Sequence, residues 1–186
     1  MVTEKHYRNP QGLNEILSEI LGHPVHGDWD RDIPSEVYIG KLKKEKVKGR
    51  TSQVWGSILE KHAYSYLRQK LKDSEWTLLG GEEIGGKEYD CLGWKGKPRD
   101  KQSPDLAIEM YFPIPKEEET YKFQHISKQT AKMVQKLEKI NAKYKYVVIG
   151  VPHDSDITTI ERLHPDIKVV CQEHRFKKTK IEKRTK

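Results

Sequence analysis

Apolar residues recur at helical spacing in three stretches of the chain, and each stretch predicts an amphipathic helix. The first stretch ends at Gly22, a residue type that commonly terminates helices. In the second, apolar side chains return every four positions from Trp55 to Leu71, which gives one apolar face. The three helices are expected over residues 11–21, 52–71 and 120–140.

Five shorter stretches rich in β-branched and aromatic residues predict strands. The stretch from Tyr144 to Val151 is almost continuously apolar, which is typical of an interior strand buried on both faces. Gly96 and Pro98 fall between two of the stretches and predict an exposed loop there. The strands are expected over residues 76–80, 86–93, 104–112, 144–151 and 167–171.

The order of these elements, α, α, β, β, β, α, β, β, predicts an α/β fold in which a mixed central sheet is flanked by helices. The length of 186 residues leaves room for one domain, expected over residues 1–174. Within it, a helical lead-in is expected up to about residue 50, and the core from about residue 50 to residue 174. Residues 175–186 are expected to form a basic tail.

Composition narrows the class of protein. The chain is 34% hydrophobic and has no apolar run near the roughly 20 residues that a membrane span requires, so an integral membrane protein is not expected. Its opening residues do not resemble a secretory signal peptide. Cys91 and Cys171 both fall in predicted strands, so we expect buried thiols in a reducing compartment.

Positive charge is concentrated in two segments. The net charge is +7, yet residues 175–186 alone hold seven basic side chains and one acidic side chain, and residues 41–50 hold six basic and one acidic. The rest of the chain is slightly acidic. Two basic segments on an acidic body are compatible with a protein that contacts nucleic-acid phosphates, and equally with a solvated loop and tail. The charged side chains of the first segment are Lys41, Lys43, Lys44, Lys46, Lys48 and Arg50, with Glu45.

Acidic residues recur on two neighbouring predicted strands. In the strand over residues 104–112, alternation places Glu109 opposite an apolar face. In the preceding strand it places Asp90 on one face, and Tyr89 and Cys91 together on the other. If the two strands pair, their carboxylates converge, and like charges that face each other across strands are destabilising. A hard cation such as Mg²⁺ would compensate. The alternative is an outward, solvated face of an edge hairpin.

These features resemble the PD-(D/E)XK nuclease core, an αβββαβ scaffold, from about residue 50 to residue 151. The segments LEKHAYSYL and SPDLAIEMYF, together with the length and the basic tail, more closely resemble the small subunit of heterodimeric type IIS restriction endonucleases. This resemblance implies a cytoplasmic, bacterial enzyme subunit that hydrolyses a phosphodiester of one strand of double-stranded DNA. It also implies dependence on Mg²⁺, for which Mn²⁺ substitutes, and a larger, site-recognising partner subunit, with the isolated small subunit a monomer.

The resemblance assigns roles to particular residues. Asp90 and Glu109 match the two metal-binding acids of the motif, and Glu60 matches a helix carboxylate that some members add. The motif lysine is absent, since its position is occupied by Tyr111. Some relatives move that role to the following helix, where His125 is the best-placed substitute. Lys128 and Lys122 are the next candidates for that role. Lys128 and the basic residues of segment 41–50 are also expected to contact the DNA backbone.

Two alternatives stay open on the residues alone. Asp105 follows Pro104 and could be the first acid of the motif, although it lies four residues from Glu109 on one strand, roughly 13 Å away. It is better explained as the residue that starts the strand. The chain as a whole could also be a non-catalytic, basic nucleic-acid-binding domain whose acids are ordinary surface charge.

Overall fold

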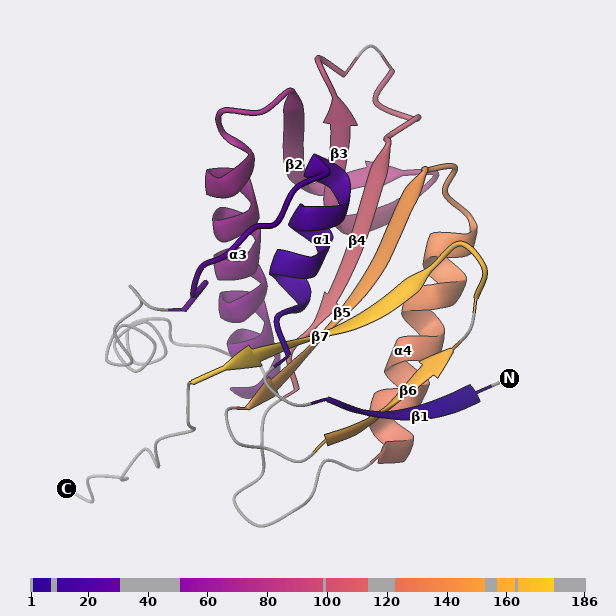
Figure 1. Ribbon diagram of the computed structural model, residues 1–186. Helices are drawn as coiled ribbons and strands as arrows, with labels where there is room; N and C mark the ends of the chain where they lie inside the picture. Colours follow the sequence, from indigo (N-terminus) through magenta and orange to yellow (C-terminus); the bar gives the residue numbers. More distant parts are fainter. Residues whose placement is uncertain are drawn as a thin grey trace, which may run out of the picture.

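A mixed sheet of five strands, ordered β2-β3-β4-β5-β7, organises the molecule (Figure 1). The computed structural model describes residues 2–7, 10–30, 51–98, 100–113, 123–152, 157–162 and 164–175. Neighbouring strands are antiparallel from β2 to β4 and parallel from β4 to β7. The strands are β2 (Trp76–Ile84), β3 (Lys87–Lys95), β4 (Leu106–Tyr111), β5 (Tyr144–Pro152) and β7 (Lys168–His174).

Helices cover both faces of this sheet (Figure 1). Two of them pack on one face with the first hydrophobic core, and the third packs on the other face with the second core. They are α1 (Gly12–Leu21) and α3 (Thr51–Leu71) on the first face, and α4 (Phe123–Glu138) on the second. The predicted α/β class, with a mixed sheet between helices, is therefore confirmed.

The central strand β4 shows why the layers form. Leu106, Ile108 and Met110 point into the core with α1 and α3, while Ala107 points into the core with α4. All four are at most 4% exposed. A strand that is apolar on both faces must be covered on both, and the crossover helix α4, which connects β4 to the parallel strand β5, covers the second face.

The hairpin β2–β3 is longer than the sequence predicts. Gly85 and Gly86 form its two-residue turn with φ of 59° and 75°, values that suit the type I′ turn of tight hairpins. The strands were expected to end at residue 80 and to begin at residue 86. Acidic residues and glycines are poor strand formers, so propensity alone did not reveal the extension to Ile84.

Two glycines allow close packing of the layers. A Cβ at Gly12 would lie 2.5 Å from the Cys171 carbonyl oxygen, so the start of α1 rests directly on the backbone of β7. A Cβ at Gly150 would lie 2.0 Å from the ring of Phe112, so this side chain fills the space over β5. The absence of a side chain is what permits each contact.

A second, two-stranded sheet was not predicted. It pairs β1 (Val2–Tyr7) with β6 (Ile157–Arg162) in antiparallel register (Figure 1). The helical lead-in expected before residue 50 therefore contains a strand, β1, in addition to helix α1. The strands are far apart in the chain and largely polar, and neither carries a local pattern strong enough to indicate its partner.

The helix predictions agree with the structure where it is described. α1 ends at Gly22, which has the left-handed conformation and donates its N–H to the Ser18 carbonyl. The expected start of the third helix, at residue 120, lies outside the described residues. Cys91 and Cys171 are buried free thiols, as predicted. No helix among the described residues is long and apolar enough to cross a membrane.

Candidate active site

The antiparallel ladder between β3 and β4 stops one residue short of two carboxylates. Its last backbone pair joins Cys91 to Ile108. The same register would next pair Asp90 with Glu109. Instead, the Asp90 N–H donates to Glu109 Oε1 over 3.2 Å, and the Met110 N–H donates to Asp90 Oδ2 over 2.7 Å. Each carboxylate thus replaces a backbone carbonyl as the acceptor from the opposite strand.

The strand alternation that the sequence predicts fails at this point. Tyr89 and Cys91 were expected on one face of β3, but Cys91 packs in the core with α1 and α3, and Tyr89 packs in the core with α4. Asp90, between them, belongs to neither of the two described ladders of β3. Opposite Asp90 on β2, Gly81 has a φ of 67°. Because both ladders are interrupted here, β3 can change the face to which its side chains point.

Glu60 approaches the two carboxylates from α3. It is half-buried and lines the same hollow as Asp90, between α3 and the β2–β3 hairpin. Burial, the largest cause, and the charges of Asp90 and Glu109 together raise the pKa of Glu60 to about 8. The structure therefore brings together the three acids that the sequence singled out.

Lys136 reaches the same cluster from α4, on the other side of the sheet. Its Nζ lies 2.7 Å from Glu109 Oε2 and 4.9 Å from the centre of the Tyr89 ring. The Tyr89 hydroxyl donates to the Lys136 carbonyl over 3.3 Å, so ring and hydroxyl both contact this one residue. The Lys136 side chain is only 24% exposed. This lysine is held in place from two sides.

Lys136 was not predicted from the sequence, because the candidates for the role of the motif lysine all lie near the start of the helix. A clue was present in the apolar stripe of that helix. Lys136 lies three residues after Met133 and four before Ile140, so helical spacing places it on the face that packs against the sheet. A lysine within an apolar stripe needs a buried or half-buried partner, and Glu109 is that partner.

The cluster carries more negative than positive charge. Burial, the largest cause, and the charge of Asp90 raise the pKa of Glu109 to about 7 against the opposing effect of the bond from Lys136. Burial also raises the pKa of Asp90, against the effect of the Met110 N–H. One ammonium therefore balances only part of the charge of three carboxylates when all are ionised.

An open hollow gives access to the cluster. Its volume is about 330 Å³, and it lies along the outer face of α3 where this helix meets the β2–β3 hairpin. Asp90 links the hollow to Glu109, whose Oε1 accepts the Asp90 N–H. The lining residues are Ser57, Glu60, Lys61 and Tyr64 from α3, and Gly80, Gly81, Glu88 and Asp90 from the hairpin.

The donor set suits a hard divalent cation, which prefers carboxylate oxygens. Within the described ranges, no three carboxylate, imidazole or thiolate groups are already arranged as metal ligands. Glu109 and Asp90 do accept hydrogen bonds from the protein, but each carboxylate oxygen has a second acceptor position. Asp90, Glu109 and Glu60 therefore fit a cation of this class by their chemistry and by their uncompensated charge.

Other predicted site residues are placed only in part. Lys128 is exposed on α4, eight residues before Lys136. His125 belongs to α4, but its side chain lies outside the described residues, as do Lys122 and the basic segment 41–50. Asp105 lies directly before β4, at the entry to the strand as expected: its Oδ2 accepts from the Lys95 N–H over 2.8 Å, which fixes the loop before the strand.

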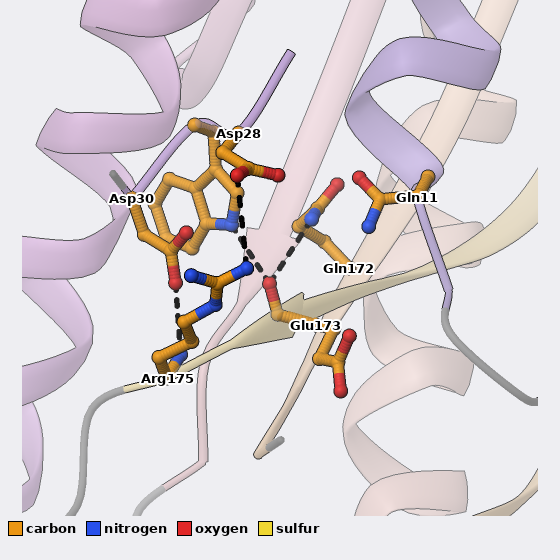
Figure 2. Close-up of a pocket in the computed structure, with 7 residues that line it drawn as sticks. Gln11, Asp28, Asp30, Gln172, Glu173 and Arg175 are labelled. Atoms are coloured by element: carbon orange, nitrogen blue, oxygen red, sulfur yellow. Dashed lines mark hydrogen bonds and ion pairs between the residues drawn. The ribbon is translucent and has the colours of Figure 1, made fainter. Parts of the chain in front are cut away.

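A second polar cluster joins the residues after α1 to the end of β7 (Figure 2). The Trp29 indole N–H donates to the Glu173 carbonyl over 2.8 Å, and the Arg175 N–H donates to Asp30 Oδ2 over 2.8 Å. The Arg175 guanidinium also lies 3.6 Å from Asp28 Oδ2. The basic segment 41–50 follows this cluster along the chain from Asp30, and the basic tail follows it from Arg175. Hydrogen bonds and an ion pair thus join residues 28–30 to residues 173–175, and a basic segment follows each of these two stretches in the sequence.

No protein-family model matches the chain, and no curated protein and no solved structure matches it either. Any function must therefore be argued from the residues and their geometry.

Proposed function

We propose that this chain is the catalytic subunit of a metal-dependent DNA endonuclease that hydrolyses a phosphodiester of one strand. The observation that carries the proposal is the pair of carboxylates at the gap in the β3–β4 ladder, where Glu109 accepts the Asp90 N–H and Asp90 accepts the Met110 N–H, with Glu60 beside them. A sheet gains nothing from two carboxylates inserted between its strands. A site that binds a cation does gain from these carboxylates, because it needs acids in fixed positions.

Asp90 and Glu109 would hold Mg²⁺, or Mn²⁺ in its place, with Glu60 completing the set. When bound, the ion would neutralise charge that develops on the phosphodiester and lower the pKa of the attacking water. The protein contributes the orientation: backbone N–H groups from the opposite strand fix both acids. Burial of the site strengthens each electrostatic interaction.

Lys136 takes the role that the resemblance gives to the missing motif lysine. Its ammonium contacts Glu109, the second acid of the motif, although it comes from α4 and not from position 111. It can donate to a phosphate oxygen or orient the attacking water from this position. His125 remains the alternative for this role, and replacing each residue separately distinguishes the two.

The order of elements supports the same class of enzyme. From α3 to β5 the chain runs α, β, β, β, α, β, with the two acids on the second and third strands and a parallel pair closing the series. A restriction-endonuclease-like core would have this order of elements, which supports the proposal. We extend the proposal to the small subunit of a heterodimeric type IIS system in the bacterial cytoplasm, which works on double-stranded DNA with a larger, site-recognising subunit.

The test is a calorimetric titration of Mn²⁺ into the chain with a short DNA duplex present. Asp90→Asn and Glu109→Gln remove a charge but keep the shape and an acceptor oxygen, so both variants should fold. We expect Mn²⁺ binding to weaken at least tenfold in each. Glu83→Gln, an exposed acid on the same hairpin, is the matched control and should bind as the wild type does. Binding that is indifferent to both substitutions would leave the non-catalytic nucleic-acid-binding alternative.

A further inference from the structure

The hollow beside the acidic cluster has one basic side chain in its lining. Glu60, Glu88 and Asp90 make the hollow acidic, and Lys61 supplies its only ammonium among the described lining residues. A DNA phosphate brought to such acids is repelled unless cations compensate. A metal ion would neutralise part of this charge, and the ammonium at the wall is placed to neutralise more.

The side chains from α3 follow one helical face. Ser57, Glu60, Lys61 and Tyr64 are spaced three, four and seven residues from the first, so all four face the hollow. Ser57 and Lys61 are exposed, whereas Glu60 and Tyr64 are half-buried. The face therefore has an acidic inner part next to Asp90 and an outer part that bears a hydroxyl and an ammonium.

Lys61 and Lys136 differ in their ion pairing. Within the described part of the chain, the Lys61 ammonium forms no ion pair, while that of Lys136 is bonded to Glu109 at 2.7 Å. The two lysines approach the site from opposite faces of the sheet, Lys61 from α3 and Lys136 from α4 (Figure 1). Lys136 thus neutralises a protein carboxylate, and Lys61 is available to a ligand.

The wall of the hollow that faces Lys61 lacks side chains at two positions. Gly80 lies under the ring of Tyr64, where an added Cβ would be 3.2 Å away, so packing explains this glycine. At Gly81 an added Cβ would meet only the end of the Glu88 side chain, 3.3 Å away, and the exposed backbone here, with a φ of 67°, lines the hollow. A glycine inside a strand often marks the close approach of another backbone.

We infer that this hollow receives the sugar-phosphate backbone of the strand to be cut, and that Lys61 binds a phosphate next to the scissile one. The inference rests on the proposed function and names the contact through which the substrate reaches that site. The contact is to a phosphate, so it is independent of base sequence and positions the strand without selecting it. Ser57 can donate a second hydrogen bond to the same group.

Binding of a fluorescent DNA duplex to the full chain in Ca²⁺, measured at several salt concentrations, tests this contact. We expect Lys61→Gln to weaken binding by about five- to tenfold and to lower the slope of log K against log salt by about one. Lys61→Arg should restore both. Arg68→Gln is the matched control, because Arg68 is exposed on the same helix, seven residues away, and does not line the hollow.

The outcomes separate this inference from the proposed function. If Lys61→Gln behaves as Arg68→Gln does, or if the wild-type chain fails to bind duplex even at low salt, the role of Lys61 is overturned. Repeated without duplex, the Mn²⁺ titration is independent of that result, because Lys61 is not a proposed ligand and Lys61→Gln should bind Mn²⁺ normally. Loss of Mn²⁺ binding in Lys61→Gln would also contradict a contact to phosphate alone.

Discussion

Lys136 Nζ and Glu109 Oε2 lie 2.7 Å apart, and this ion pair joins helix α4 to the central strand β4 inside the molecule. Glu109 is 4% exposed, so its charge is tolerated only with a partner of opposite sign. The pair places an ammonium beside the acid that shares a gap in the sheet with Asp90. The same ion pair therefore contributes to the packing of α4 on the sheet and to the chemistry proposed for the site.

Replacing Lys136 should therefore affect cleavage far more than folding. Lys136→Met keeps the length of the side chain and removes the ammonium, and Glu109 can then take up a proton. We expect DNA cleavage by the complete enzyme to fall by about a hundredfold or more. Lys132→Met, an exposed change on the same helix, should leave the rate unchanged. Equal rates for the two variants would remove Lys136 from the mechanism.

The raised pKa values of Glu60 and Glu109 predict how stability depends on pH without metal. Both groups keep their protons in the folded chain up to about pH 8 and about pH 7, above their ordinary value of 4.5. The folded state thus binds more protons, and its stability is lost as the pH rises through these values. We expect Tm to fall between about pH 5 and about pH 8, where the folded chain holds protons that the unfolded chain has lost. Glu60→Gln should flatten this fall, and a parallel curve for that variant would contradict the assignment.

Addition of Mg²⁺ should act in an overlapping pH range and in the opposite direction. The ion binds the ionised carboxylates, so it stabilises the folded chain more at high pH than at low pH. We expect the rise in Tm at saturating Mg²⁺ to grow from about pH 6 to about pH 9 and to vanish in Asp90→Asn. A rise that is equal at all pH values would indicate binding elsewhere.

Tyr89 holds Lys136 through its ring and its hydroxyl, and two variants separate these contacts. Tyr89→Phe keeps the ring beside the ammonium and loses only the bond to the Lys136 carbonyl, so cleavage should stay within about threefold of wild type. Tyr89→Leu loses the ring and should lower both kcat and stability, the latter by about 2 kcal/mol. Chemical denaturation and single-turnover cleavage measure the two effects. A kcat of Tyr89→Leu equal to wild type would show that Tyr89 does not position Lys136.

Asp30 and Asp28 both contact Arg175, but they should differ in their contribution to stability. Asp30 is 8% exposed and accepts the Arg175 N–H, so Asp30→Ala should cost about 1–2 kcal/mol of unfolding free energy. Asp28 forms an exposed ion pair at 3.6 Å, so Asp28→Ala should cost less than about 0.5 kcal/mol. Urea denaturation of the two variants checks this order, and equal costs would contradict it.

Much of the fold and part of the site follow from local patterns in the sequence. The alternation of Leu106, Ile108 and Met110 predicted a strand with one apolar face, because side chains of a strand point to opposite sides in turn. The apolar run from Tyr144 to Val151 predicted a strand buried on both faces. Helical spacing and Gly22 likewise predicted α1 and its end. The same spacing rules placed Asp90 and Glu109 on consecutive strands, near enough to expect that they converge.

Long-range hydrogen bonds decided the rest. The exchange between Asp90, Glu109 and the Met110 N–H interrupts the ladder and turns Tyr89 toward α4, which no alternation rule anticipates. Lys136 is selected as the partner of Glu109 by the packing of α4 on the sheet, and the pairing of β1 with β6 joins segments some 150 residues apart. Local periodicity determines which elements form and which face they bury. Which side chains meet at a gap between strands depends on register and packing, which exist only in the assembled structure.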